Sequence, residues 1–384
     1  MPVNNAWYYD ATYGHGPLAL SAGQTLALNG IQERLHPSLS FLANRWNNRG
    51  DVAFIQGIGD GSANSFSHFD SMRMWQTADS ALLTPSGWLG RFNDLRQAGN
   101  AYASMSLYDY RLESQGVQSA PAVAQRLSDF FVRAPGFPLP DPAFWRTQLQ
   151  ASAQQIAPGL AELGQLITRT YGMSAEITAA ANDALPYSES GRVPFYLAQA
   201  ALLIKAGVAS QTYSYAFGPF DTHGDQLTRQ SELFNQLNAG LTAFFSVLAA
   251  SPRANDVIVV ISSEFGRQVT HNASAGTDHG LAGTAIAFGG GIRGGLYGEL
   301  PTLDPGGVTR PNRINDALPI TTNFRRLYAP ILNKLAGDDG TAQLVLGSEF
   351  GANLGIFGAA QSILRNGFEG IATASTSLHH ALAS

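Results

Sequence analysis

Carboxylates and histidines gather in three short segments in the second half of the sequence. The segment FDTHGD contains Asp221 and His223, and GTDHG contains Asp278 and His279, with Glu264 between them in SSEFGR. Carboxylate oxygens and neutral imidazoles are the ligands that zinc, manganese and related divalent ions take in proteins. If the fold brings these segments together, the five side chains predict a metal site that polarises an ester oxygen.

Two further residues extend this chemistry. Ser67 opens a predicted helix, where free N–H groups and the helix dipole favour an anionic group, so its hydroxyl is either a nucleophile or a simple N-cap. Arg267 follows Glu264 in SSEFGR, so its guanidinium either clamps an oxygen of an anionic substrate or forms a surface ion pair with Glu264. The predicted catalytic residues are Ser67, Glu264 and Arg267, with Glu264 acting as a ligand or a general base.

The same segments also have readings without chemistry. Asp221 in DTHG is consistent with a turn in which the carboxylate bonds to its own backbone. Asp278 and His279 are consistent with a capped helix start, and His68, next to Ser67, with a partly buried structural histidine. Convergence of all the segments on one rim of the fold would favour the metal site over these readings.

The elements that position these residues alternate between strands and helices. Predicted strands are 51–57, 102–108, 211–217, 256–263 and 283–289, and predicted helices are 67–80, 193–207, 228–250 and 322–337. This alternation predicts an α/β fold with a doubly wound, mostly parallel sheet and helices on both faces. Ligands bind outside the carboxyl ends of such strands, and the candidate residues directly follow predicted strands.

The length of 384 residues suits one large domain. We expect residues 1–358 to form a single α/β domain with a helical insertion around 134–190. The alanine- and serine-rich residues 359–384 are predicted to form a peripheral tail.

Composition excludes several functional classes. The net charge of −5 argues against a nucleic-acid partner, because backbone binding requires a basic surface. The absence of cysteine excludes disulfides, thiolate metal sites and a cysteine nucleophile. We find no apolar run long enough to predict a transmembrane segment and no signal peptide at the start of the chain.

Several blocks resemble the DUF1501 family. FDTHGDQ, VIVVISSEFGR and GTDHGLAGTAIAFGGGIRGGLYGELPTL carry the resemblance, together with SHFDSMRMWQTAD near the N-terminus and TTNFRRLYAPILNKLAG near the C-terminus. The family is placed near the sulfatases and alkaline phosphatases, so the resemblance implies an alkaline-phosphatase-like fold. Many members carry a twin-arginine leader, which implies a periplasmic or exported location.

The resemblance implies roles for individual residues and also shows departures. Asp221 and His223 resemble a pair that holds one metal, and His279 resembles the late histidine that closes that site. Phe265 stands where the superfamily usually has a histidine, and Asn323 stands where the family often has an aspartate. The family's opening strand with its Gly-Gly-x-Asp-Gly loop has no counterpart here, and these departures favour one divalent ion (zinc, manganese, calcium or magnesium) over two.

Three functions remain open at this stage. The first is a metal-dependent hydrolase of a phosphate or sulfate ester, whose substrate would be a small anionic ester. The second is a catalytically degenerate family member that serves as a binding or assembly component. The third is another metal-assisted reaction on the same rim, such as isomerisation or phosphoryl transfer. The sequence either begins after the family's first strand or lacks that strand; if the strand is absent, an uncovered sheet edge would also favour an oligomer.

Overall fold

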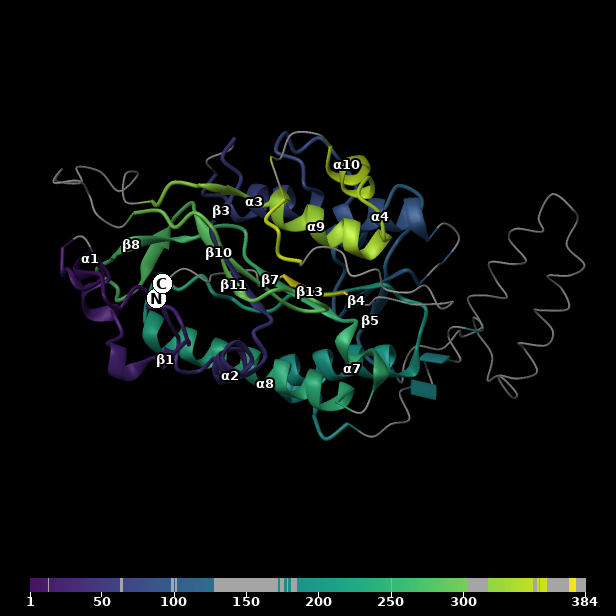
Figure 1. Cartoon of the computed structure of the whole chain (residues 1–384), viewed down its shortest axis with the longest axis horizontal. Coiled ribbons are helices and arrows are strands. Elements are labelled where there is room, and N and C mark those ends of the chain that lie inside the picture. The colour runs from purple at the N-terminus through teal and green to yellow at the C-terminus, as the bar shows by residue number, and fades with distance from the viewer. Residues whose placement is uncertain are drawn as a thin grey trace, which may run out of the picture.

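A computed structural model gives the fold (Figure 1). It describes residues 1–12, 14–62, 65–97, 100, 102–127, 185–249, 251–302, 317–347, 351, 353–357 and 373–377, with isolated positions at 172, 176–177 and 179–180. The helical insertion predicted around 134–190 therefore lies mostly outside the described residues. In the part of the chain that is described, no helix is long and apolar enough to cross a membrane.

One large mixed sheet runs through the middle of the molecule. Its strands follow the order β11-β3-β10-β7-β13-β6-β4-β5, and β12 also pairs with β3. The strands are β3 (Val52–Gly59), β4 (Ser104–Leu107), β5 (Ala122–Ala124), β6 (Thr212–Tyr215), β7 (Ile258–Ser262), β10 (Gly283–Gly289), β11 (Gly295–Gly298), β12 (Thr322–Asn323) and β13 (Thr373–Ser377). Every pairing is parallel except those that β10 makes with β3 and β7. The prediction of a mostly parallel sheet is confirmed.

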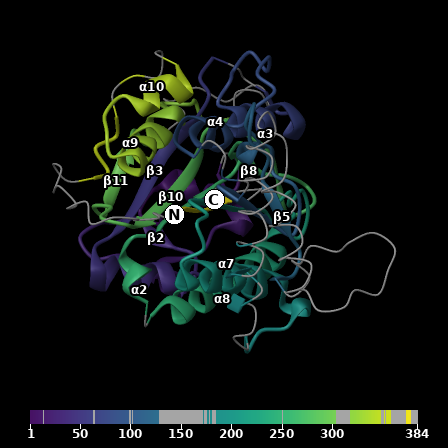
Figure 2. The ribbon, with the colours of Figure 1, turned by 90° about the vertical axis from the view of Figure 1, so that its right-hand side faces the viewer.

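Helices cover both faces of this sheet (Figure 2). One face carries α2 (Ser40–Arg49), α7 (Arg192–Ala206) and α8 (Gln226–Leu248), and the other carries α3 (His68–Thr77), α4 (Trp88–Arg96), α9 (Arg325–Ala336) and α10 (Thr341–Leu346). The short helix α1 (Ala6–Tyr9) and the hairpins β1 (Leu26–Ala27) with β2 (Arg34–Leu35) and β8 (Arg267–His271) with β9 (Thr277–His279) complete the described elements, apart from 3-10 turns.

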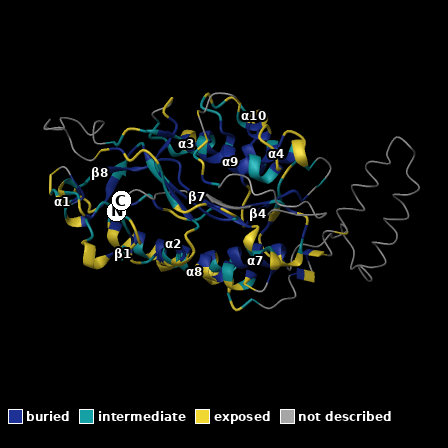
Figure 3. Cartoon of the chain, in the orientation of Figure 1, coloured by how far each residue is buried: buried dark blue, intermediate teal, exposed yellow. Residues whose placement is uncertain are grey.

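Two hydrophobic cores explain this three-layer arrangement. Along β3, Val52 and Phe54 pack into the core under α2, α7 and α8, whereas Ala53 and Ile55 pack into the core under α3, α4 and α9. Successive side chains of a strand point to opposite faces, so a continuous apolar run requires cover on both sides. Figure 3 shows the central strands buried between helices whose outer surfaces are exposed.

One strand of the sheet runs against the others, and part of the C-terminal segment pairs within the sheet. The strand β10 runs antiparallel because only the short β8–β9 hairpin separates it from β7, so no crossover helix returns the chain. The tail 359–384 was expected to be peripheral, but residues 373–377 form β13 between β6 and β7.

A buried ion pair joins the end of β3 to the start of α9. The Asp60 carboxylate accepts hydrogen bonds from Ser62 Oγ at 2.6 Å, from Ser80 Oγ at 2.5 Å and from Arg325 Nη1 at 3.2 Å. Burial alone would raise the pKa of Asp60, but the serine hydrogen bonds and the guanidinium outweigh it and lower that pKa below 3.8. We therefore interpret Asp60, which follows a strand at the candidate rim, as a structural group.

Replacing Asp60 with asparagine is expected to lower the free energy of unfolding by about 3 kcal/mol at pH 7, because Arg325 then loses its buried counter-charge. The folded-state pKa lies below the unfolded value, so this stabilisation is complete above about pH 4 and is lost as the pH falls further. Urea titrations at several pH values should show that the difference in free energy of unfolding between the native protein and the variant becomes smaller as the pH falls. Replacement of the exposed Asp339 should leave the free energy within about 0.5 kcal/mol, and an equal gap at all pH values would contradict the assignment.

Candidate metal centre

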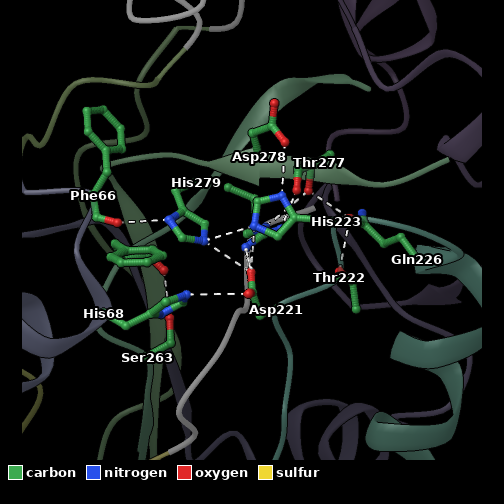
Figure 4. A network of polar contacts seen from close by, with 12 residues as sticks. Phe66, His68, Asp221, Thr222, His223, Gln226, Ser263, Thr277, Asp278 and His279 are labelled. Atoms are coloured by element: carbon green, nitrogen blue, oxygen red, sulfur yellow. Dashed lines mark hydrogen bonds and ion pairs between the residues drawn. The ribbon is translucent and has the colours of Figure 1, made fainter. Parts of the chain in front are cut away.

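Loops from three strands meet at one edge of the sheet. Asp221 and His223 lie between β6 and α8, Glu264 follows β7, and His68 begins α3 after β3, while Asp278 and His279 end the hairpin strand β9. Because β3, β6 and β7 run in the same direction, their carboxyl ends share this edge. Figure 4 shows the imidazoles of His68, His223 and His279 turned toward the Asp221 carboxylate.

The carboxylate of Asp221 is fixed from behind by a buried arginine. Arg267 Nη1 donates to Asp221 Oδ1 at 2.7 Å, Nη2 donates to the carbonyl of Thr277, and the arginine side chain is only 1% exposed. Burial would raise the pKa of Asp221, but the hydrogen bond and the positive charge of Arg267 outweigh it and hold that pKa well below its usual range. Asp221 is therefore a permanent anion at neutral pH.

The three imidazoles share one hydrogen-bonding pattern, in which Nδ1 contacts an acceptor. Nδ1 of His68 lies 2.8 Å from Glu264 Oε1, Nδ1 of His279 lies 2.8 Å from the Phe66 carbonyl, and Nδ1 of His223 lies 2.9 Å from Asp278 Oδ1. Each of these partners is an acceptor, so each Nδ1 carries a proton. In the neutral rings the Nε2 atoms then hold lone pairs, the tautomer in which histidine binds a metal through Nε2.

These Nε2 atoms converge on the carboxylate. Nε2 of His279 and of His223 lie 3.1 Å and 3.0 Å from Asp221 Oδ1, and Nε2 of His68 lies 3.5 Å from Oδ2. The two nitrogens of His223 and His279 are 3.0 Å apart, so either a proton or a cation must separate their lone pairs. Ligands about 2 Å from a tetrahedral ion lie about 3.3 Å from one another, a spacing close to these contacts.

The residues His68, Asp221 and His279 form the group whose ligand atoms all lie within 4.8 Å of one another. Its two histidines differ electrostatically: the hydrogen bond to Glu264 raises the pKa of His68 against the effect of burial, whereas burial lowers the pKa of His279. Phe265 packs its ring 4.9 Å from that of His68 and 4.8 Å from that of His279. The side chain in the position expected for a second-metal histidine therefore forms an apolar wall.

Backbone contacts hold the two histidine loops together. A side chain at Gly276 would place its Cβ 2.3 Å from the carbonyl oxygen of Thr222, so only glycine lets the β8–β9 turn approach the Asp221 loop. Thr277 Oγ1 donates to Gln226 Oε1 at 2.7 Å, and Thr222 Oγ1 donates to the same oxygen at 3.2 Å. This buried network connects β9, the Asp221 loop and the first turn of α8.

The structure separates the predicted site residues into two groups. Asp221, His223 and His279 come together with their ligand atoms facing one another, whereas Glu264 and Asp278 contact the Nδ1 atoms on the far sides of two of the rings. Asp278 and His279 lie on strand β9, not at a helix start. Arg267 was predicted to clamp a substrate oxygen. Its guanidinium is instead buried against Asp221 and Thr277.

The N-terminus of α3 offers a candidate ligand atom from His68, which the sequence placed on the rim but did not include in the predicted metal site. Ser67 is the N-cap, and its Oγ accepts a hydrogen bond from Asp70 N at 3.4 Å. Its neighbour His68 enters the cluster instead. The available signal was its position at the carboxyl end of β3, on the same rim as the other histidines.

Fold and site together define an α/β protein with a cluster of histidines around one carboxylate at the carboxyl edge of a mostly parallel sheet. The sequence profile described as "Protein of unknown function (DUF1501)" matches residues 63–342, and the chain belongs to the DUF1501 family. Searches of curated proteins and of solved structures gave no match.

Proposed function

We propose that the protein is a metal-dependent hydrolase of phosphate or sulfate esters with a single divalent ion, zinc by preference, at the histidine cluster. The observation that carries the proposal is the convergence of three Nε2 atoms on the Asp221 carboxylate, each with its Nδ1 hydrogen-bonded to an acceptor. Zinc in catalytic sites takes three or four nitrogen and oxygen ligands of this kind. When bound there, the ion supplies Lewis acidity toward an ester oxygen.

The protein's own groups then have distinct tasks. Asp221, His68 and His279 bind the ion, and His223 is a fourth candidate ligand because its Nε2 lies against both Asp221 and His279. Glu264 and Asp278 orient His68 and His223 through their Nδ1 atoms, the arrangement that raises the basicity of a ligating imidazole. Of the three residues first considered catalytic, Ser67 remains a candidate nucleophile, whereas Arg267 positions Asp221.

One observation favours the alternative, a catalytically degenerate family member that binds a ligand or partner. Arg267 is bonded to Asp221, so its guanidinium is not available to an anionic substrate. In that case the metal would serve structure or ligand binding, without turnover. Both the hydrolase and the degenerate family member are compatible with an alkaline-phosphatase-like fold and an exported location. These two features rest on the resemblance alone.

Metal loading is expected to switch hydrolysis on. Protein stripped with a chelator should take up about one zinc ion per chain, and hydrolysis of 4-nitrophenyl phosphate or 4-nitrophenyl sulfate should return with the ion. Elemental analysis gives the stoichiometry, and absorbance of nitrophenolate gives the rate. Binding without turnover of any phosphate or sulfate ester would favour the degenerate reading, and failure to bind any divalent ion would refute the metal centre.

A further inference from the structure

A cavity of about 200 Å³ lies beneath the N-terminal segment and is bordered on one side by Arg267, the residue that holds Asp221. Its walls come from residues before α2, from β3 and β10 of the sheet, and from α8. Most lining side chains are apolar, among them Leu28, Ile31, Leu39, Phe54, Phe234 and Leu296. None of His68, Asp221 and His279 lines it. An apolar hollow of this size is a ready site for a small hydrophobic molecule.

One histidine places a hydrogen-bond donor in this apolar wall. The backbone N–H of Ser38 donates to His36 Nδ1 at 3.2 Å, so the neutral ring carries its proton on Nε2. The ring packs on Phe234 with 4.8 Å between centroids, and the residue is only 7% exposed. No partner for Nε2–H occurs among the described residues, so this donor is open to an acceptor in the cavity that His36 lines.

The floor of the cavity adds two weaker polar groups. Gln56 interrupts the buried run of β3, and a register shift between Gly283 and Ala285 of β10 leaves Thr284 beside it. Neither side chain has a hydrogen-bond partner within the described ranges. A ligand with one polar end thus meets amide and hydroxyl groups near the sheet and hydrocarbon elsewhere.

The electrostatics of the cavity disfavour an anionic ligand. Burial lowers the pKa of His36 to about 4, so the ring is uncharged at neutral pH. The two arginines at the cavity are already engaged, since Arg34 donates to Thr25 and Arg267 to Asp221. The ammonium group of Met1 also lines the cavity and donates to the Arg34 carbonyl, so a carboxylate would be desolvated here beside cations that already have partners, whereas a carbonyl would satisfy the His36 donor.

We propose that this cavity binds a small, neutral, mainly hydrocarbon molecule whose carbonyl oxygen accepts a hydrogen bond from His36 Nε2–H. A cavity of about 150 Å³ holds benzene, so the volume here suits a ligand of about eight to ten non-hydrogen atoms. Such a site contains none of the candidate metal ligands, although Arg267 borders both the cavity and the histidine cluster.

Two nearly isosteric probes test the proposal on the full chain. Acetophenone carries the carbonyl oxygen, and α-methylstyrene has a CH₂ group in its place. Calorimetric or NMR titration should give about threefold to tenfold tighter binding of acetophenone, the worth of one neutral hydrogen bond. The variant His36→Phe keeps the ring that stacks on Phe234 and should bring the ratio of the two affinities to about one.

A cavity-filling variant locates the binding. Thr284→Phe should weaken both probes by more than about tenfold, because the added ring occupies the space of the ligand. Equal affinities of the two probes for the native protein, undiminished binding by Thr284→Phe, or no binding of either probe would each overturn the proposal. The comparison of probes on the native protein decides the question even if His36→Phe does not fold.

Discussion

Replacing His279 with alanine is expected to abolish retention of the divalent ion and to lower kcat/KM for ester hydrolysis by at least about a hundredfold. Loss of a group that merely orients a ligand already costs about ten- to a hundredfold in metal affinity or activity, and His279 offers a ligand atom itself. Its Nδ1 is held by the Phe66 carbonyl, so no other tautomer competes for the ion. Elemental analysis after desalting and initial rates on a nitrophenyl ester measure both effects.

Two companion variants make this result specific. His271→Ala removes an imidazole from the same β8–β9 hairpin but outside the cluster, and it should retain both the ion and the rate. Glu264→Gln should give an intermediate loss of about tenfold to a hundredfold, because it weakens only the hydrogen bond that orients His68. Full metal occupancy in His279→Ala would show that the converging Nε2 atoms do not form a metal centre.

The layers of this fold were predictable because they follow from local patterns. The β-branched run ending at Ser262 and the apolar run at 283–289 both became buried strands, and the second matches β10 residue for residue. The direction of β10 was not predictable in the same way, because the hairpin before it carries no strong turn signature. Strand direction depends on the length of the connection, and residues 264–282 gave no sign of being two short strands.

For the site, residue types identified the edge of the sheet where the side chains gather. They did not show which carboxylate would face the ligand nitrogens and which would only orient a histidine. Asp221 and Asp278 look alike in sequence, each one or two residues before a histidine, yet one faces three Nε2 atoms and the other contacts an Nδ1. Which side of a ring a carboxylate meets depends on the register between loops, which Gly276 sets by its contact with Thr222. His68 was passed over for a related reason: the motif drew attention to the hydroxyl of Ser67, and the helix start presents the next side chain to the cluster.

Replacing Arg267 with methionine is expected to lower the free energy of unfolding by about 3 kcal/mol when the metal is absent. Removing one partner of a buried ion pair costs about 3–5 kcal/mol, and the lower end applies because the Asp221 side chain is 32% exposed. The variant also leaves the carbonyl of Thr277 without its charged donor. Urea unfolding in the presence of a chelator measures this loss, and Arg49→Met, which removes an exposed contact of 3.8 Å to Asp51, should cost less than about 1 kcal/mol.

Zinc should reduce the loss in free energy of unfolding that Arg267→Met causes. This dependence on zinc separates an electrostatic role of Arg267 from a packing role. The negative charge of Asp221 is balanced by Arg267 in the free protein, and a divalent ion against the same carboxylate would supply the missing positive charge in the variant. The ion also stabilises whichever protein binds it, so the comparison is the difference between native protein and variant, measured once with chelator and once at saturating zinc. If this difference is the same in both conditions, Arg267 contributes by packing and by its bond to Thr277, and the charge on Asp221 is not what it balances.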